Sequence, residues 1–301
     1  MNKLLLSVCL LFSCLVNADE SLIGSSNFIL SGGEDRVEKE ISVYVHIPKN
    51  WKKDSPVVLV IPGAGRNAWS YRDAWVEQSE KKGVIVISPS YSEDFYPRFW
   101  NYNIARMISN VTINESKTDF ESYSISENPS EWIFNDFDRI FEDVKSKFGL
   151  TTEQYDMFGH SAGGQILHRF ALFYDSKSVN RILASNSGWY TVPNFDAEFP
   201  IGLINAPLTQ EALKVAFSKR LVVFLGELDN ENETRGHLVK NQRMNVQGLH
   251  RLERGVFFYS SAMREAKSQG VRFNWEKVII PNVGHDYKKM SAAAAEYLYP
   301  L

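Results

Sequence analysis

The chain has 301 residues, of which 44% are hydrophobic and 23% charged, and its formal net charge is −3. This composition is typical of globular proteins and excludes disordered, collagen-like and coiled-coil chains. Basic residues occur as isolated pairs and form no stripe that would follow a nucleic-acid backbone, so we expect no nucleic-acid partner. A chain of this length can bury a sizeable core, and we expect residues 19–301 to form a single domain.

The first 18 residues have the pattern of an export signal. Lys3 precedes an apolar run, Leu4–Val16, which is too short to span a bilayer, and small residues follow up to Ala18. We therefore expect cleavage after Ala18 and a secreted or periplasmic protein without a transmembrane segment, with lipidation at Cys14 as an alternative. Both cysteines, Cys9 and Cys14, lie in this segment, so we expect no disulfide in the mature chain.

The rest of the chain alternates predicted strands with predicted helices. In chain order we predict strands at 41–47, 56–61 and 84–87, a helix at 131–147, a strand at 155–158, a helix at 162–174, a strand at 181–185, a helix at 211–218, a strand at 221–225, a helix at 255–267, a strand within 271–280 and a closing helix at 291–298. This order predicts an α/β fold with a mostly parallel central sheet and helices on both faces. Two polar stretches, 101–129 and 230–249, are candidate lid insertions.

The motif Gly159-His160-Ser161-Ala162-Gly163 stands between a predicted strand and a predicted helix. A nucleophile elbow requires this context, because it presents a serine on a strained turn where neighbouring side chains must be small. Ser161 is therefore the predicted nucleophile. His160 adjoins it, and we expect its side chain to point away from the serine hydroxyl.

A serine hydroxyl becomes nucleophilic when a base removes its proton, and an acid must hold that base in the right tautomer. His285 follows a late predicted strand in a glycine-containing loop and is the best candidate base. Asp229 follows the strand 221–225 and is the candidate acid, with Glu227 as the alternative. The chain order Ser161, Asp229, His285 is that of an α/β-hydrolase catalytic triad.

The tetrahedral intermediate of acyl transfer needs two amide donors. One is the backbone N–H of Ala162, the residue after the nucleophile. For the other we choose Ala64, in the loop that follows the strand 56–61, with Gly63 as the alternative. Trp189 and Tyr190 follow another strand end and are candidate lining residues of the substrate pocket.

On these motifs the chain resembles the α/β-hydrolase superfamily, and more loosely the extracellular polyhydroxybutyrate depolymerase and feruloyl esterase type of serine esterase. The resemblance implies hydrolysis of a small or polymeric ester through an acyl-enzyme, without a cofactor. The sequence likewise carries no metal-binding motif. An amide or peptide hydrolase with the same triad remains an alternative, as does a non-catalytic binding module on the same scaffold. The substrate and the oligomeric state are left open.

Overall fold

The computed structural model describes residues 23–116 and 119–300; the predicted export signal lies outside these ranges. Its strands are β1 (Gly24–Ser31), β2 (Glu40–Ile47), β3 (Val57–Ile61), β4 (Ile85–Ser90), β5 (Ile108–Ile113), β6 (Phe120–Ile125), β7 (Tyr155–His160), β8 (Val179–Ser185), β9 (Leu221–Gly226) and β10 (Glu276–Ile280). Its α-helices are α1 (Ala68–Asp73), α2 (Val76–Lys82), α3 (Trp100–Asn103), α4 (Phe134–Phe148), α5 (Ala162–Phe173), α6 (Gln210–Ser218), α7 (Gln242–Asn245), α8 (Arg251–Ser268) and α9 (Tyr287–Leu298). Two short 3₁₀ helices are η2 (Glu34–Arg36) and η3 (Pro129–Glu131).

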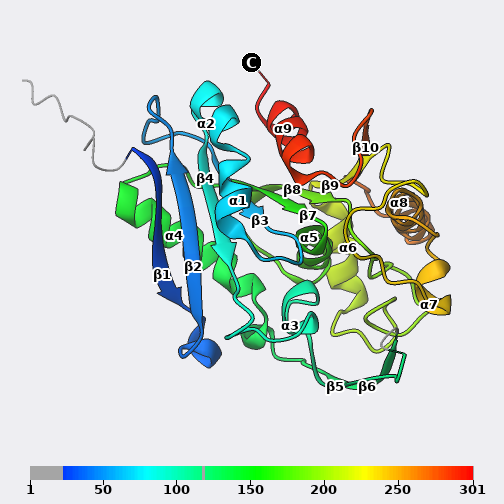
Figure 1. Cartoon of the computed structure of the whole chain (residues 1–301). Helices are drawn as coiled ribbons and strands as arrows, with labels where there is room; N and C mark the ends of the chain where they lie inside the picture. Colours follow the sequence, from blue (N-terminus) through cyan, green and yellow to red (C-terminus); the bar gives the residue numbers. More distant parts are fainter. Residues whose placement is uncertain (1–22, 117–118, 301) are drawn as a thin grey trace, which may run out of the picture.

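An eight-stranded sheet in the order β1-β2-β4-β3-β7-β8-β9-β10 crosses the molecule (Figure 1). Neighbouring strands in the part β4-β3-β7-β8-β9-β10 of this sheet are parallel. At the other edge, β1 pairs with β2, and β2 with β4, in antiparallel register. This confirms the mostly parallel α/β sheet expected from the sequence. The antiparallel β1 lies ahead of residue 41, where the first strand was predicted from the sequence.

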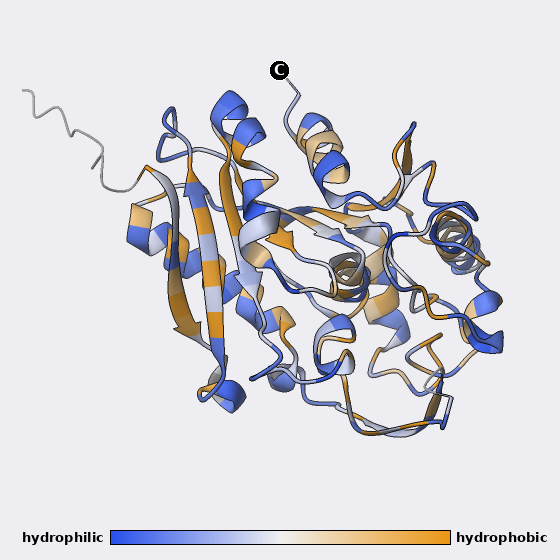
Figure 2. Cartoon of the chain, viewed as in Figure 1, coloured by the Kyte–Doolittle hydropathy of each residue, from blue (hydrophilic) through white to orange (hydrophobic). Residues whose placement is uncertain are grey.

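Successive side chains of the central strands point to opposite faces of the sheet, as the two-residue period of a strand requires. In β3, Leu59 packs into one apolar core together with residues of α4, α5, α6 and α8. Its neighbours Val58 and Val60 pack into a second core with α1 and α9. Because both faces are covered, the parallel strands have continuous apolar sequences. In the partly exposed β2, the buried apolar residues Ile41, Val43 and Val45 alternate instead with the less buried Glu40, Ser42 and Tyr44 (Figure 2).

The two candidate lid stretches contain structure of their own. Residues 101–129 include the end of α3 and the antiparallel hairpin β5–β6, which lies apart from the main sheet (Figure 1). Residues 230–249 form loops around the single-turn helix α7. Within the described ranges, no helix is long and apolar enough to cross a membrane.

Candidate active site

Ser161 stands between the end of β7 and the start of α5, at the carboxyl edge of the sheet. Its backbone has φ 58° and ψ −115°, a conformation that a non-glycine residue adopts at a cost. The turn is tight because a Cβ on Gly159 would come within 2.5 Å of the Gly163 carbonyl oxygen, and a Cβ on Gly163 would collide with backbone atoms of Ile61. The glycines around Ser161 are therefore required by the close packing of the elbow.

His285 and Asp229 come from the loops after β10 and β9 and meet beside the elbow. The Nδ1 atom of His285 lies 2.7 Å from Oδ2 of Asp229, and both side chains are almost fully buried. A carboxylate only accepts hydrogen bonds, so this contact places the ring proton on Nδ1 and leaves Nε2 as the basic nitrogen. His285 and Ser161 line the same cavity. The arrangement suits a base that is held in one tautomer.

Glu227, the alternative acid, lies elsewhere. Its side chain is exposed, and its Oε2 accepts the backbone N–H of Asn282 at 2.8 Å. Asp286, which adjoins His285 in sequence, caps α9 by accepting two backbone N–H groups and pairs with Arg235. Of these three carboxylates, the structure brings only that of Asp229 to the imidazole.

Asp229 has a second partner that the sequence did not reveal. Nη1 of Arg251, a buried residue at the start of α8, lies 3.2 Å from Oδ1 of Asp229. The same guanidinium donates to the backbone carbonyl oxygens of Arg235 and His237, at 3.4 Å and 3.1 Å. Arg251 thus connects the carboxylate beside His285 to the loop that borders the cavity.

Glu233 holds His285 from the backbone side. Its Oε2 accepts the His285 amide at 2.6 Å and a guanidinium N–H of Arg235 at 2.7 Å. Hydrogen bonds from Arg235 are the main reason that the pKa of Glu233 is lowered to about 2. Gly236 completes this loop at φ +68°, and a Cβ there would lie 3.0 Å from Cδ2 of His285. Glycine at this position leaves the imidazole edge open.

His160 lies closer to this site than the sequence suggested. Its ring centroid is 4.5 Å from that of His285, and its Nδ1 is 3.2 Å from the hydroxyl of Tyr71, on α1. Burial, followed by the neighbouring His285, lowers the pKa of His160 well below its ordinary value, so the ring stays neutral. A neutral ring against His285 adds no fixed charge to compete with the protonation of that base.

The loop after β3 supplies the candidate oxyanion donor. Gly63, Ala64 and Gly65 line the cavity together with Ala162. A Cβ on Gly63 would lie 2.8 Å from the Tyr71 hydroxyl, so the loop is closely packed at this position, and both Ala64 and Gly63 stay candidates for the second donor. The Tyr102 hydroxyl donates to the Pro62 carbonyl oxygen at 2.7 Å, and this hydrogen bond helps to fix the loop.

The cavity that contains Ser161 has a volume of about 480 Å³. Trp189 lines it, as expected, whereas Tyr190 does not: the Tyr190 ring is fully buried and stacks on Phe258 at 4.5 Å between centroids. The packing of this loop turns the second of the two aromatic residues into the core. Among the described residues that line this cavity, none is acidic, and the described ranges hold no cluster of side chains fit for a metal ion.

The sequence matches no protein-family model and no curated protein. Among solved structures, the chain is similar to poly(aspartic acid) hydrolase-1 from Sphingomonas sp. KT-1, with 31% identity, a TM-score of 0.79, and coverage of 91% of this chain and 98% of that one. It is also similar to a poly(3-hydroxybutyrate) depolymerase from Bordetella parapertussis, with 26% identity, a TM-score of 0.81, and coverage of 92% and 89%.

A siderophore hydrolase from Aspergillus nidulans, 15% identical with a TM-score of 0.52, covers 92% of this chain and 97% of its own, and shares the fold. The first neighbour is similar enough in sequence, over nearly its whole length, to show the family. The chain therefore belongs to the α/β-hydrolase superfamily and is an esterase-type serine hydrolase.

Proposed function

We propose that this protein cleaves carboxylic esters through the triad Ser161, His285 and Asp229. The observation that carries the proposal is the geometry at one cavity. Ser161 sits on a strained elbow, and the His285 that lines the same cavity has its Nδ1 held by Asp229 at 2.7 Å. A serine, a base and an orienting acid are the components of a nucleophilic acyl-transfer site.

The proposed reaction has two steps. Nε2 of His285 accepts the proton of the Ser161 hydroxyl while Oγ attacks the ester carbonyl carbon, and the amides of Ala162 and Ala64 stabilise the oxyanion. The tetrahedral intermediate collapses, His285 gives its proton to the leaving alcohol, and an acyl-Ser161 ester remains. Water, deprotonated by His285, then attacks this ester, and the second tetrahedral intermediate collapses to release the acid and the Ser161 oxygen, which takes the proton back from His285.

A second candidate is hydrolysis of an amide with the same residues, because one solved neighbour is described as a poly(aspartic acid) hydrolase. That polymer is a polyanion. Arg235 lines the cavity, but its guanidinium already pairs with Glu233 and Asp286. This pairing favours a neutral ester over an anionic amide chain.

The test compares p-nitrophenyl acetate with p-nitroacetanilide, on the purified protein and on the Ser161→Ala variant. We expect the unaltered protein to hydrolyse the ester roughly 100-fold faster than the anilide, because p-nitrophenoxide leaves more readily than the anilide nitrogen. We expect no hydrolysis by the variant. Faster cleavage of the anilide would support the amide alternative. Ester hydrolysis by a folded Ser161→Ala variant would contradict the proposed nucleophile.

We also propose that the chain is exported and cleaved after Ala18. The supporting pattern lies in residues 1–18, outside the described ranges. Edman sequencing of the protein recovered from a host that exports it is expected to begin at Asp19. An N-terminus at a lipid-modified Cys14 would contradict this site and support the lipoprotein alternative.

A further inference from the structure

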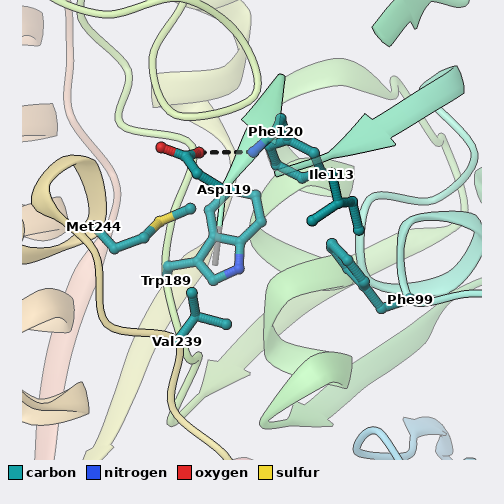
Figure 3. Close-up of a pocket in the computed structure, with 7 residues that line it drawn as sticks. All are labelled: Phe99, Ile113, Asp119, Phe120, Trp189, Val239 and Met244. Carbon is teal, nitrogen blue, oxygen red and sulfur yellow. Dashed lines mark hydrogen bonds between the residues drawn. The ribbon is translucent and has the colours of Figure 1, made fainter. Parts of the chain in front are cut away.

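A smaller cavity opens beside the one that contains Ser161. We call it the apolar subsite; its side chains are Phe99, Ile113, Phe120, Trp189, Val239 and Met244 (Figure 3). Its volume is about 50 Å³. Phe99, Trp189 and Val239 also line the larger cavity, so the two cavities adjoin at these side chains. The remaining walls come from the candidate lid stretches 101–129 and 230–249.

The polar group at the subsite does not make it a charge-binding site. Asp119 is its seventh lining residue, and its Oδ1 accepts the backbone N–H of Phe120 at 2.9 Å, the dashed line in Figure 3. The same oxygen lies 3.3 Å from Nη1 of Arg243. With its carboxylate paired, the subsite offers a ligand mainly apolar side chains.

The subsite is preformed, because the ring of Trp189 is held in place. The guanidinium carbon of Arg169 lies 4.2 Å from the centre of that ring. Arg169 is itself fully buried and donates to the hydroxyl of Thr191 and to the backbone carbonyl oxygens of Asn103 and Gln165. Burial lowers the pKa of Arg169 to about 9, still high enough to keep it charged at neutral pH. A rigid aromatic wall costs no ordering entropy when a ligand enters.

The chemistry of the triad decides which end of the substrate reaches this subsite. His285 must protonate the leaving alcohol, so that alcohol lies next to the imidazole. His285 is flanked by His160 and Gly236, whereas Trp189, which lines both cavities, packs on Arg169 of α5. The acyl part of the substrate is then the part directed toward the apolar subsite.

We propose that the apolar subsite binds the aliphatic end of the acyl group and makes the enzyme selective for short-chain acyl esters, butyrate to hexanoate. This deepens the proposed function and rests on it. A dry cavity of roughly 150 Å³ holds a benzene molecule, so the 50 Å³ found here fits a few methylene groups and excludes a ring.

The test measures kcat/KM for p-nitrophenyl acetate, butyrate, hexanoate, octanoate and benzoate. We expect the value to rise about four-fold per added methylene while the chain fills the subsite, which is the gain from burying one CH₂ group, and to fall from octanoate onward. Benzoate is expected to be poorer than hexanoate. A profile that is flat, or that peaks at acetate or benzoate, would overturn the subsite while leaving the proposed ester hydrolysis intact; no hydrolysis of any ester would instead overturn the proposed function.

Two substitutions of Met244, which lines the subsite but not the larger cavity, sharpen the test. Met244→Ala enlarges the subsite and is expected to move the optimum toward octanoate. Met244→Phe fills it and is expected to lower the ratio of kcat/KM for butyrate to that for acetate about 16-fold, as expected for two methylenes at about four-fold each. Met263→Ala, at an exposed methionine of α8, is the matched control and should leave the profile unchanged.

Equal changes for all chain lengths in both Met244 variants would overturn the proposal. Thermal melting of each variant shows whether it is folded. Should a variant fail to fold, the chain-length profile of the unaltered protein still decides between the two outcomes.

Discussion

Two walls of the same cavity are built on different principles. The polar wall is the set of residues around His285, of which Arg235 and Gly236 line the cavity, and it holds His285 through hydrogen bonds and ion pairs; its members are Asp229, Glu233, Arg235, Gly236 and Arg251. The apolar wall consists of Phe99, Trp189 and Val239. Hydrogen bonds are directional and fix atoms in place, whereas apolar burial is non-directional and selects by size. We infer that the first wall sets how fast a bound ester reacts, and the second sets which ester is bound.

The largest effect is expected from removing the charge of Asp229, the acid that holds His285. Asp229→Asn is expected to lower kcat roughly 10⁴-fold, because an amide at this position stabilises the wrong tautomer of the base. Glu227→Gln, an equivalent change two residues away on an exposed side chain, is expected to leave kcat within about two-fold, since surface substitutions have small effects. Steady-state kinetics on p-nitrophenyl butyrate measure both. If Glu227→Gln lost most of its kcat while Asp229→Asn kept it, Glu227 and not Asp229 would be the acid that orients His285.

A smaller loss of activity is expected from the substitution Gly236→Ala. The new Cβ would lie 3.0 Å from Cδ2 of His285, so the imidazole must shift by a few tenths of an ångström, and we expect kcat to fall about ten-fold, less than the loss of about 10²-fold that a 1 Å misplacement produces. Gly149→Ala is the matched control, because Gly149 also has a positive φ, +63°, but open space around its Cβ.

Both glycine variants carry the conformational cost of an alanine at positive φ, about 1–2 kcal/mol. Only Gly236→Ala should lose activity. Equal kcat in the two variants would show that Gly236 does not govern the position of His285.

The contact between Tyr71 and His160 supports the polar wall from the opposite side. Tyr71→Phe removes the hydroxyl that lies 3.2 Å from Nδ1 of His160, and we expect kcat to fall about five-fold, the effect of losing one hydrogen bond of about 1 kcal/mol. Tyr259→Phe on α8 serves as the control. An unchanged kcat in Tyr71→Phe would show that the ring of His160 needs no support from α1.

Glu233 gives the smallest expected effect and a distinct pH dependence. Its pKa is lowered from 4.5 to about 2 in the folded chain, so its ionised form contributes stability above pH 4.5, and this contribution is lost as pH falls toward 2. Glu233→Gln should therefore lower Tm at pH 7 by roughly 2–4 °C, as expected for about 1 kcal/mol. Thermal melting from pH 7 to pH 2 is expected to show the difference shrinking below pH 4.5.

Glu121→Gln, an exposed carboxylate on β6, is the control for that experiment. A difference in Tm that grows as the pH falls would have the wrong sign and contradict the role given to Glu233.

The sequence was sufficient for the parts of the fold and site that depend on local patterns. The β-branched runs that became β3 and β9 are buried on both faces, and such runs have few alternatives to a central strand. The elbow at Ser161 was predicted because the motif Gly159-His160-Ser161-Ala162-Gly163 joins a strand to a helix. Helices α1 and α2 went unpredicted; they are short and start without a side-chain cap.

The polar wall could not be predicted, because it is assembled from segments far apart in sequence. Arg251 reaches Asp229 across 22 residues, and Glu233 reaches the His285 amide across 52. No local spacing marks such partners, and Arg and Glu residues are usually solvated. Tyr190 was misplaced for a related reason: the direction of a side chain after a strand end is set by the packing of the loop, here against Phe258.

The central claim is that Ser161 is the one serine that the site activates. The most direct test labels the protein with a fluorophosphonate, digests it and locates the adduct by tandem mass spectrometry. We expect one adduct per chain, on Ser161, in the unaltered protein and in Glu227→Gln, with slow labelling in Asp229→Asn and none in Ser161→Ala. An adduct on any other serine, or labelling of a folded Ser161→Ala variant at the original rate, would contradict the account.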